Sequence, residues 1–132
     1  MTKLNLSYIA GYFDGEGCIY ADSHGIRVFI TNTYLPMLEA INEYFGGIGK
    51  IVVKKRYERD VANKECYILT FWSGRAETVL KELEPYLVEK RPQAILALAI
   101  RMTMGRKGRS HPPSVIYDYR DWLGKQMMEM KR

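Results

Sequence analysis

The stretch YIAGYFDGEGCI, residues 8–19, joins a short apolar run to two carboxylates, Asp14 and Glu16, that alternate with glycines. Apolar residues spaced three and four apart predict a helix over residues 5–14, and the glycine-rich segment that follows is expected to end it. Neighbouring acids repel each other unless a positive group, such as a metal ion or a helix N-terminus, lies between them. The segment therefore predicts a site that holds something positive.

Patterns on both sides of this segment predict a single α+β domain over residues 1–132, which ends in a basic C-terminal extension over 105–132. Alternating residues and turn signals indicate two hairpins, which together make a four-stranded antiparallel sheet. Asn32 or Thr33 is expected to cap the helix between them. The predicted order is helix, hairpin, helix, hairpin and then helices, with hairpins at 17–32 and 48–72 and later helices at 74–87, 92–104 and 114–131.

The charge distribution favours an anionic partner. The chain carries a net charge of +5, and the positive charge is concentrated in residues 48–64, with a net +4, and residues 101–132, with a net +5. The alternative is that these lysines and arginines are ordinary solvated side chains. The extension could add phosphate contacts, or its aromatic helix could pack on the body of the domain.

The remaining sequence signals indicate an ordinary intracellular protein. No apolar run approaches the roughly 20 residues of a membrane span, and the N-terminus lacks the cleavage site of a signal peptide, so we expect no membrane partner. Cys18 and Cys66 have no metal-binding spacing and are expected to be small strand residues in a reducing compartment.

The motif from Ile9 to Gly17, IAGYFDGEG, resembles the sequence that names the LAGLIDADG homing endonucleases. The segment EPYLVEKRPQAILAL, residues 84–98, is similar to the family segment in which a Pro-aromatic-Leu run precedes a lysine and a helix, with Lys90 at the lysine position. The resemblance covers residues 4 to about 104, which it implies are the core of the domain. It implies a LAGLIDADG homing endonuclease-like fold of the single-motif, homodimeric type.

The resemblance also implies an activity and its residues. We expect a site-specific DNA endonuclease of intron homing that cleaves both strands of a long pseudo-palindromic duplex by hydrolysis with Mg²⁺, for which Mn²⁺ could substitute. Glu16 lies at the position of the metal-binding acid, where Asp is more common in the family, and the Gly15 carbonyl is expected to assist it; hard cations accept either acid. Lys90 and Asn32 are expected to be catalytic, although Asn32 could equally be only a helix cap.

A single copy of the motif implies that a second chain completes the site. In the family, two motif helices pack against each other at a two-fold axis, and small residues such as Ala10 and Gly11 allow a close approach. Asp14 lies in the same region, where it is expected to bond to backbone amides near the crossing rather than to a metal.

Alternate residues of a strand share one face, and the resemblance implies that one such face of the sheet forms the DNA-binding surface. The resemblance implies that this face of the sheet lies in the major groove. A solvated hairpin is the alternative. The expected DNA-binding residues are Tyr20, Asp22, Arg27, Phe29, Lys50, Val52, Lys54, Arg56, Cys66, Ile68 and Thr70.

Two other functions fit the same resemblance. An intron maturase that binds intron RNA would have a similar basic surface, and so would a catalytically inactive DNA-binding protein. The presence of Glu16 and Lys90 argues against the inactive form.

Overall fold

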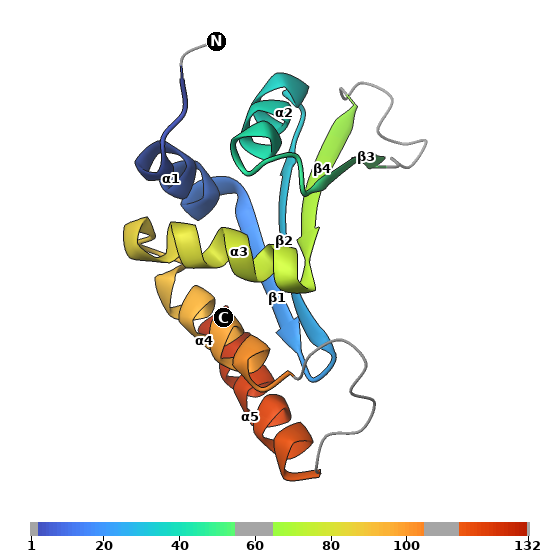
Figure 1. Cartoon of the computed structure of the whole chain (residues 1–132), viewed down its shortest axis with the longest axis vertical. Helices are drawn as coiled ribbons and strands as arrows, with labels where there is room; N and C mark the ends of the chain where they lie inside the picture. The colour runs from blue at the N-terminus through green and yellow to red at the C-terminus, as the bar shows by residue number, and fades with distance from the viewer. Residues whose placement is uncertain (1–2, 55–64, 105–113, 132) are drawn as a thin grey trace.

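The computed structural model describes residues 3–54, 65–104 and 114–131. Its described strands form one antiparallel sheet in the order β1-β2-β4-β3, and the predicted α+β class with two hairpins is confirmed (Figure 1). The elements are α1 (Leu6–Glu16), β1 (Gly17–Asp22), β2 (Gly25–Asn32), α2 (Leu35–Tyr44), β3 (Lys50–Lys54), β4 (Cys66–Trp72), α3 (Ser73–Leu83), the 3₁₀ turn η2 (Glu84–Tyr86), α4 (Arg91–Met102) and α5 (Ser114–Met130).

Helix α1 is longer than its sequence pattern predicted. It begins at the N-cap Asn5, whose side-chain oxygen accepts a hydrogen bond from the Tyr8 amide at 2.8 Å, and it continues through Gly15 to Glu16. The chain turns to extended backbone at Gly17, and this position requires glycine because a Cβ there would lie 2.3 Å from the ring of Phe13. The prediction that the helix ends at residue 14 was therefore wrong by about half a turn, and Glu16 lies on the helix.

Helix α2 also starts later than predicted. Its N-cap is Tyr34 rather than Asn32 or Thr33, and Pro36 occupies its first turn, where a missing amide proton costs no hydrogen bond. It stops at Gly46 and Gly47, whose φ angles of 82° and 73° lie in the left-handed region that glycine adopts without strain.

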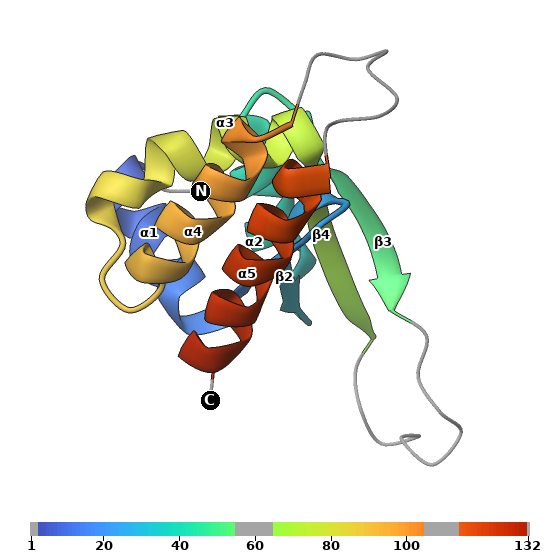
Figure 2. The same ribbon diagram turned by 90° about the horizontal axis from the view of Figure 1, so that it is seen from below.

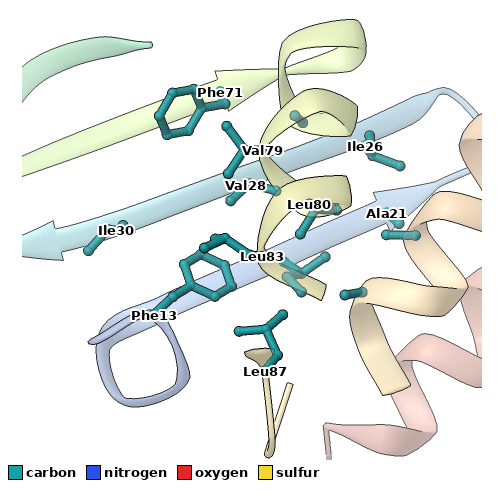
Figure 3. Close-up of a cluster of buried hydrophobic side chains, with 14 of the residues drawn as sticks. Phe13, Ala21, Ile26, Val28, Ile30, Phe71, Val79, Leu80, Leu83 and Leu87 are labelled. Atoms are coloured by element: carbon teal, nitrogen blue, oxygen red, sulfur yellow. The ribbon is translucent and has the colours of Figure 1, made fainter. Parts of the chain in front are cut away.

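One face of the sheet carries the hydrophobic core. Alternate residues of the strands point to this face and are buried, and helix α3 lies across it (Figure 3). Phe13 of α1 reaches the same cluster. Figure 2 shows the helices gathered on one side of the sheet. The core-facing strand residues are Ile19, Ala21, Ile26, Val28, Ile30, Leu69 and Phe71.

Helix α5 packs on the body of the domain along the edge strand β1. Leu123 and Met127 are buried in the common core, and Arg120 is only 6% exposed. The Arg120 guanidinium donates hydrogen bonds to the hydroxyl and carbonyl oxygens of Thr103, at 2.7 and 2.8 Å, and to the Ser23 carbonyl. Packing on the body is thus the alternative that these contacts support for the described part of the C-terminal extension.

Within the described ranges, none of the helices has the length and apolar character that crossing a membrane requires.

Candidate active site and nucleic-acid interface

Asp14 ties the segment before α4 to the last turn of α1. Its carboxylate accepts hydrogen bonds from the backbone amides of Val88, at 2.8 Å, and Lys90, at 3.0 Å. The Lys90 Nζ in turn donates to the main-chain carbonyl of Asp14 at 2.5 Å. This geometry gives Asp14 the expected bonds to backbone amides, although their donors belong to its own chain. It also brings the Lys90 ammonium to the C-terminal end of α1, where the helix dipole favours positive charge.

Glu16 is the acid that remains available at this helix end. It is exposed, and within the described chain its carboxylate has no hydrogen bond or ion pair. Gly15 precedes it in the final turn, where main-chain carbonyls lack a helical partner. Carboxylate and carbonyl oxygens are the ligands that hard divalent cations prefer.

A complete metal shell needs more ligands than the described residues of this chain supply. Among the described residues, no group of three or more His, Cys, Asp or Glu side chains could hold a metal ion. The Glu16 carboxylate and the Gly15 carbonyl therefore fit a divalent cation as part of its shell, with the remaining ligands coming from a second chain, a phosphate or water.

Asn32 is held at the end of β2 by two hydrogen bonds. Its Nδ2 donates to the hydroxyl of Tyr12, and its Oδ1 accepts from the Tyr34 amide at 3.0 Å. Asn32 thus supports the entry to α2 without being its N-cap. Burial raises the pKa of the Tyr12 hydroxyl; the hydrogen bond from Asn32 opposes this rise, and the nearby charge of Glu16 adds to it.

The three expected catalytic residues are therefore all anchored at α1. Glu16 ends the helix, Lys90 bonds to the main chain of its last turn, and Asn32 bonds to Tyr12, which lies one turn before Glu16. The chain brings together an acid, a cation and a carboxamide from three separate segments.

The outer face of α1 differs from the predicted interface. Ala10 has no exposed surface because it packs into the core of its own chain, so its expected place in a dimer contact was wrong. The exposed small residues are instead Ser7, Gly11 and Gly15, spaced four apart along one stripe. A Cβ built on Gly11 or Gly15 would meet no neighbouring atom within 4 Å.

The expected DNA-binding residues share the face of the sheet opposite the core. Strand register places Tyr20 beside Arg27 on neighbouring strands, and a second row crosses all four strands from Cys18 through Phe29 and Thr70 to Lys50. Thr70 is only 7% exposed and offers little contact area. The other described members of this face are Asp22, Val52, Lys54, Cys66 and Ile68; Arg56 lies outside the described residues.

Arg27 is held between two aromatic rings on this face. Its guanidinium carbon lies 5.1 Å from the ring centre of Tyr20 and 5.2 Å from that of Phe29, within the range of cation–π attraction. Asp22 fixes the first ring, because its Oδ2 accepts a hydrogen bond from the Tyr20 hydroxyl at 3.1 Å. The Asp22 Oδ1 accepts hydrogen bonds from the backbone amides of His24 and Gly25, and these bonds close the β1–β2 turn. Asp22 therefore has a structural role on this face.

Comparison with known protein families decides the identity of this arrangement. Residues 3–83 match the family described as the LAGLIDADG-like domain. The chain belongs to this family. No curated protein sequence matches the LAGLIDADG-like chain.

Solved homing endonucleases have the same fold as this LAGLIDADG-like chain. The homing endonuclease I-CvuI, solved in complex with its target in the presence of calcium, aligns with a TM-score of 0.74 and 19% identity over 95% of this chain and 80% of that one. An archaeal intron-encoded homing endonuclease, I-Vdi141I, complexed with DNA, aligns with a TM-score of 0.74 and 17% identity over 96% of this chain and 84% of that one. I-SmaMI, a LAGLIDADG homing endonuclease bound to cleaved DNA, aligns with a TM-score of 0.59 and 21% identity, and the alignment covers only 41% of the I-SmaMI chain. The predicted fold is confirmed.

Sequence reasoning missed Tyr12, although the motif contains it. The usable signal was its position, since Tyr12 and Glu16 are four residues apart and lie on the same side of the LAGLIDADG helix. What the sequence could not supply was the partner of its hydroxyl, because Asn32 comes from the far end of a hairpin.

Proposed function

We propose that this chain is a site-specific endonuclease that binds double-stranded DNA as a homodimer and cleaves both strands with a divalent cation, Mg²⁺ or Mn²⁺. The observation that carries the proposal is the exposed Glu16 carboxylate, which has no partner in the described chain while the neighbouring Asp14 is fully engaged. Structural relatives in the same family were solved with DNA and with calcium or magnesium, which supports this choice of substrate and cofactor class.

The glycines of α1 support the proposed homodimer. A glycine inside a helix destabilises it by roughly 0.5–1 kcal/mol relative to alanine. Nothing in the described chain occupies the space beside Gly11 or Gly15. A second copy of α1 crossing at close range accounts for both residues, and it brings a second Glu16 to the same region.

Each chain's own residues then have distinct roles. Glu16 and the Gly15 carbonyl bind the cation, which when bound activates water and neutralises phosphate charge. Lys90 provides a fixed positive charge that stabilises the transition state, and Asn32 orients the attacking water through its carboxamide. The bonds of Asp14 to Val88 and Lys90 keep the lysine in place.

The experiment that tests the proposal is selection from a randomised duplex library. Purified protein is incubated with the library and Mg²⁺, with Mn²⁺ and chelator arms in parallel, and the cut ends are sequenced. We expect paired cuts within one long pseudo-palindromic sequence, and none with chelator. Specific binding without cutting would instead support an inactive DNA-binding protein, and selective binding of RNA would support a maturase.

The basic residues of β3 provide a test of DNA contact. Lys50 and Lys54 are exposed on the face opposite the core. Each lysine that neutralises a phosphate adds about 0.9 to the slope of log affinity against log salt, so Lys50→Gln with Lys54→Gln is expected to flatten the slope by about 2 to 4 per dimer. Fluorescence anisotropy with the selected duplex over a range of salt measures it.

The control for this experiment is Lys81→Gln. Lys81 lies on α3, on the core side of the sheet, and pairs with Glu77 at 2.9 Å. Its removal is expected to leave the slope unchanged. A double variant of β3 with the parental slope would place the DNA elsewhere on the molecule.

Arg27 is expected to determine one base of the target. Its guanidinium carbon lies within 5.2 Å of the centres of two aromatic rings, and the planar fork of a guanidinium matches the O6 and N7 acceptors of guanine. Arg27→Lys keeps the charge but loses the fork, so discrimination at one position of each half-site should fall by about 5- to 150-fold while the other positions keep their preference. Repeating the library selection with this variant measures the change, and Arg75→Lys on α3 is the matched control. Loss of discrimination spread evenly over the site would contradict the assignment.

A further inference from the structure

Tyr12 is a polar side chain beside the proposed site that the proposed mechanism does not use. It is partly buried on α1, and its hydroxyl accepts a hydrogen bond from Asn32, twenty residues away at the end of β2. The contact therefore links the motif helix directly to the residue proposed to orient water.

The two partners of Asn32 fix which way its carboxamide points. A carboxamide has two N–H donors and two acceptor lone pairs on oxygen. The Tyr34 amide is a donor, so it requires the Asn32 oxygen on its side; a flipped amide would place donor against donor. The Asn32 Nδ2 then faces Tyr12.

After these two bonds, Asn32 retains one N–H and one oxygen lone pair. This remaining pair is what a single water molecule needs in order to be held in one orientation. Without the Tyr12 hydroxyl, only the Tyr34 amide would restrain the side chain, and the carboxamide could rotate about its last bond. Rotation spreads the water over several orientations, which slows attack without changing how the sheet binds DNA.

We propose that Tyr12 is a positioning residue, whose hydroxyl holds the Asn32 carboxamide in the orientation that presents its free N–H and oxygen to the attacking water. This inference rests on the proposed function, because it assigns Tyr12 a part in the same hydrolysis. The juxtaposition of Tyr12, Asn32 and Glu16 at the end of α1 carries it.

The first test is made on the full chain without metal or DNA. Protein labelled with ¹⁵N-asparagine gives side-chain amide signals, and the Asn32 signal is assigned by its loss in Asn32→Ala. Tyr12→Phe removes only the hydroxyl. It is expected to shift the Asn32 Nδ2 protons upfield and to reduce the chemical-shift separation between the two protons relative to the parent. Tyr44→Phe, which removes an exposed hydroxyl at the end of α2, is expected to leave them unchanged. An unchanged Asn32 signal in Tyr12→Phe would overturn the contact.

The second test is a double-mutant cycle in single-turnover cleavage of the selected duplex. Tyr12→Phe is expected to slow cleavage about 3- to 10-fold with unchanged affinity for DNA, the effect of losing one orienting hydrogen bond. In the Asn32→Ala background, the same change should alter the rate by less than about 2-fold, because its partner is already absent. Circular dichroism melts confirm that both variants fold.

The outcomes separate the inference from the proposed function. Equal slowing by Tyr12→Phe in both backgrounds, or no slowing in either, would overturn the positioning role while leaving the endonuclease intact. A parental protein that binds its selected duplex but does not cut it would overturn the proposed function, and with it the catalytic meaning of the contact. The amide signals would then still decide whether the contact exists.

Discussion

Glu16→Gln is expected to reduce single-turnover cleavage of the selected duplex by at least about 10³-fold while affinity for DNA stays within a few-fold of the parent. The amide has the shape of the carboxylate but not its charge, so it cannot retain a divalent cation at the end of α1. The fold should not suffer, because Glu16 is exposed and has no partner among the described residues. Cleavage is measured at saturating enzyme with Mg²⁺, and binding is measured with Ca²⁺.

Three companion variants separate charge from shape and cation from helper. Glu16→Asp keeps the charge and is expected to retain most of the activity, whereas Glu43→Gln, an exposed acid on α2, should have no effect. Lys90→Ala is expected to slow cleavage by about 10²- to 10⁴-fold, since the cation ligands remain. If Glu16→Gln cut both strands at the parental rate, the carboxylate would be an ordinary surface acid and the endonuclease proposal would fail.

The two hairpins were predictable because the signals for them are local. Alternation of apolar and polar residues fixes which side chains share a face, and the glycines at 46 and 47 mark the end of α2 by a backbone conformation that other residues adopt only with strain. The pairing of Thr70 with Lys50 lies within the second hairpin, but the pairing of Phe29 with Thr70 joins the two hairpins, and no local signal encodes it.

The faces of α1 were harder to predict, although the periodicity contained the answer. Ala10 was grouped with Gly11 because both are small, but a helix turns about 100° per residue, so neighbours point in different directions. Ala10 belongs with Phe13 on the buried stripe, and Gly11 belongs with Gly15 on the exposed one. The small size of both residues suggested that two helices could cross closely here. Only the position of a residue around the helix indicates whether it can face the second helix.

Other features depend on contacts between distant segments, which no local pattern encodes. From the sequence, Arg120 would be expected to be a solvated residue of the basic extension. In the structure it is buried and forms hydrogen bonds with Thr103 and Ser23. The hydrogen bond of Asn32 to Tyr12 is of the same kind. Each becomes visible only when the packing of helix against sheet is known.

Gly11→Leu is expected to weaken self-association of the chain by at least about 30-fold, because the substitution occurs twice at a two-fold axis and overpacking costs about 1–3 kcal/mol at each site. The folded chain itself has room for the side chain, since a Cβ on Gly11 meets no described neighbour within 4 Å. Leucine also favours the helix over glycine, so the monomer should be at least as stable. Sedimentation equilibrium over a range of protein concentrations measures the association.

A smaller substitution at Gly11 and a control substitution on α5 test whether association depends on the outer face of α1. Gly11→Ala adds one methyl group and should give an intermediate loss of association together with a gain of roughly 0.5–1 kcal/mol in the stability of the monomer, opposite signs that general misfolding cannot produce. Gly124→Ala makes the same chemical change on α5, where the new Cβ would lie 3.8 Å from the Ala21 carbonyl oxygen, an ordinary contact, and it should leave association unchanged. Because each chain supplies one Glu16, the monomeric Gly11→Leu variant should also lose double-strand cleavage at enzyme concentrations at which the parent is dimeric. A Gly11→Leu protein that remains a dimer and cuts both strands would mean that the two copies meet through another surface, and the exposed glycines of α1 would then lack a structural reason.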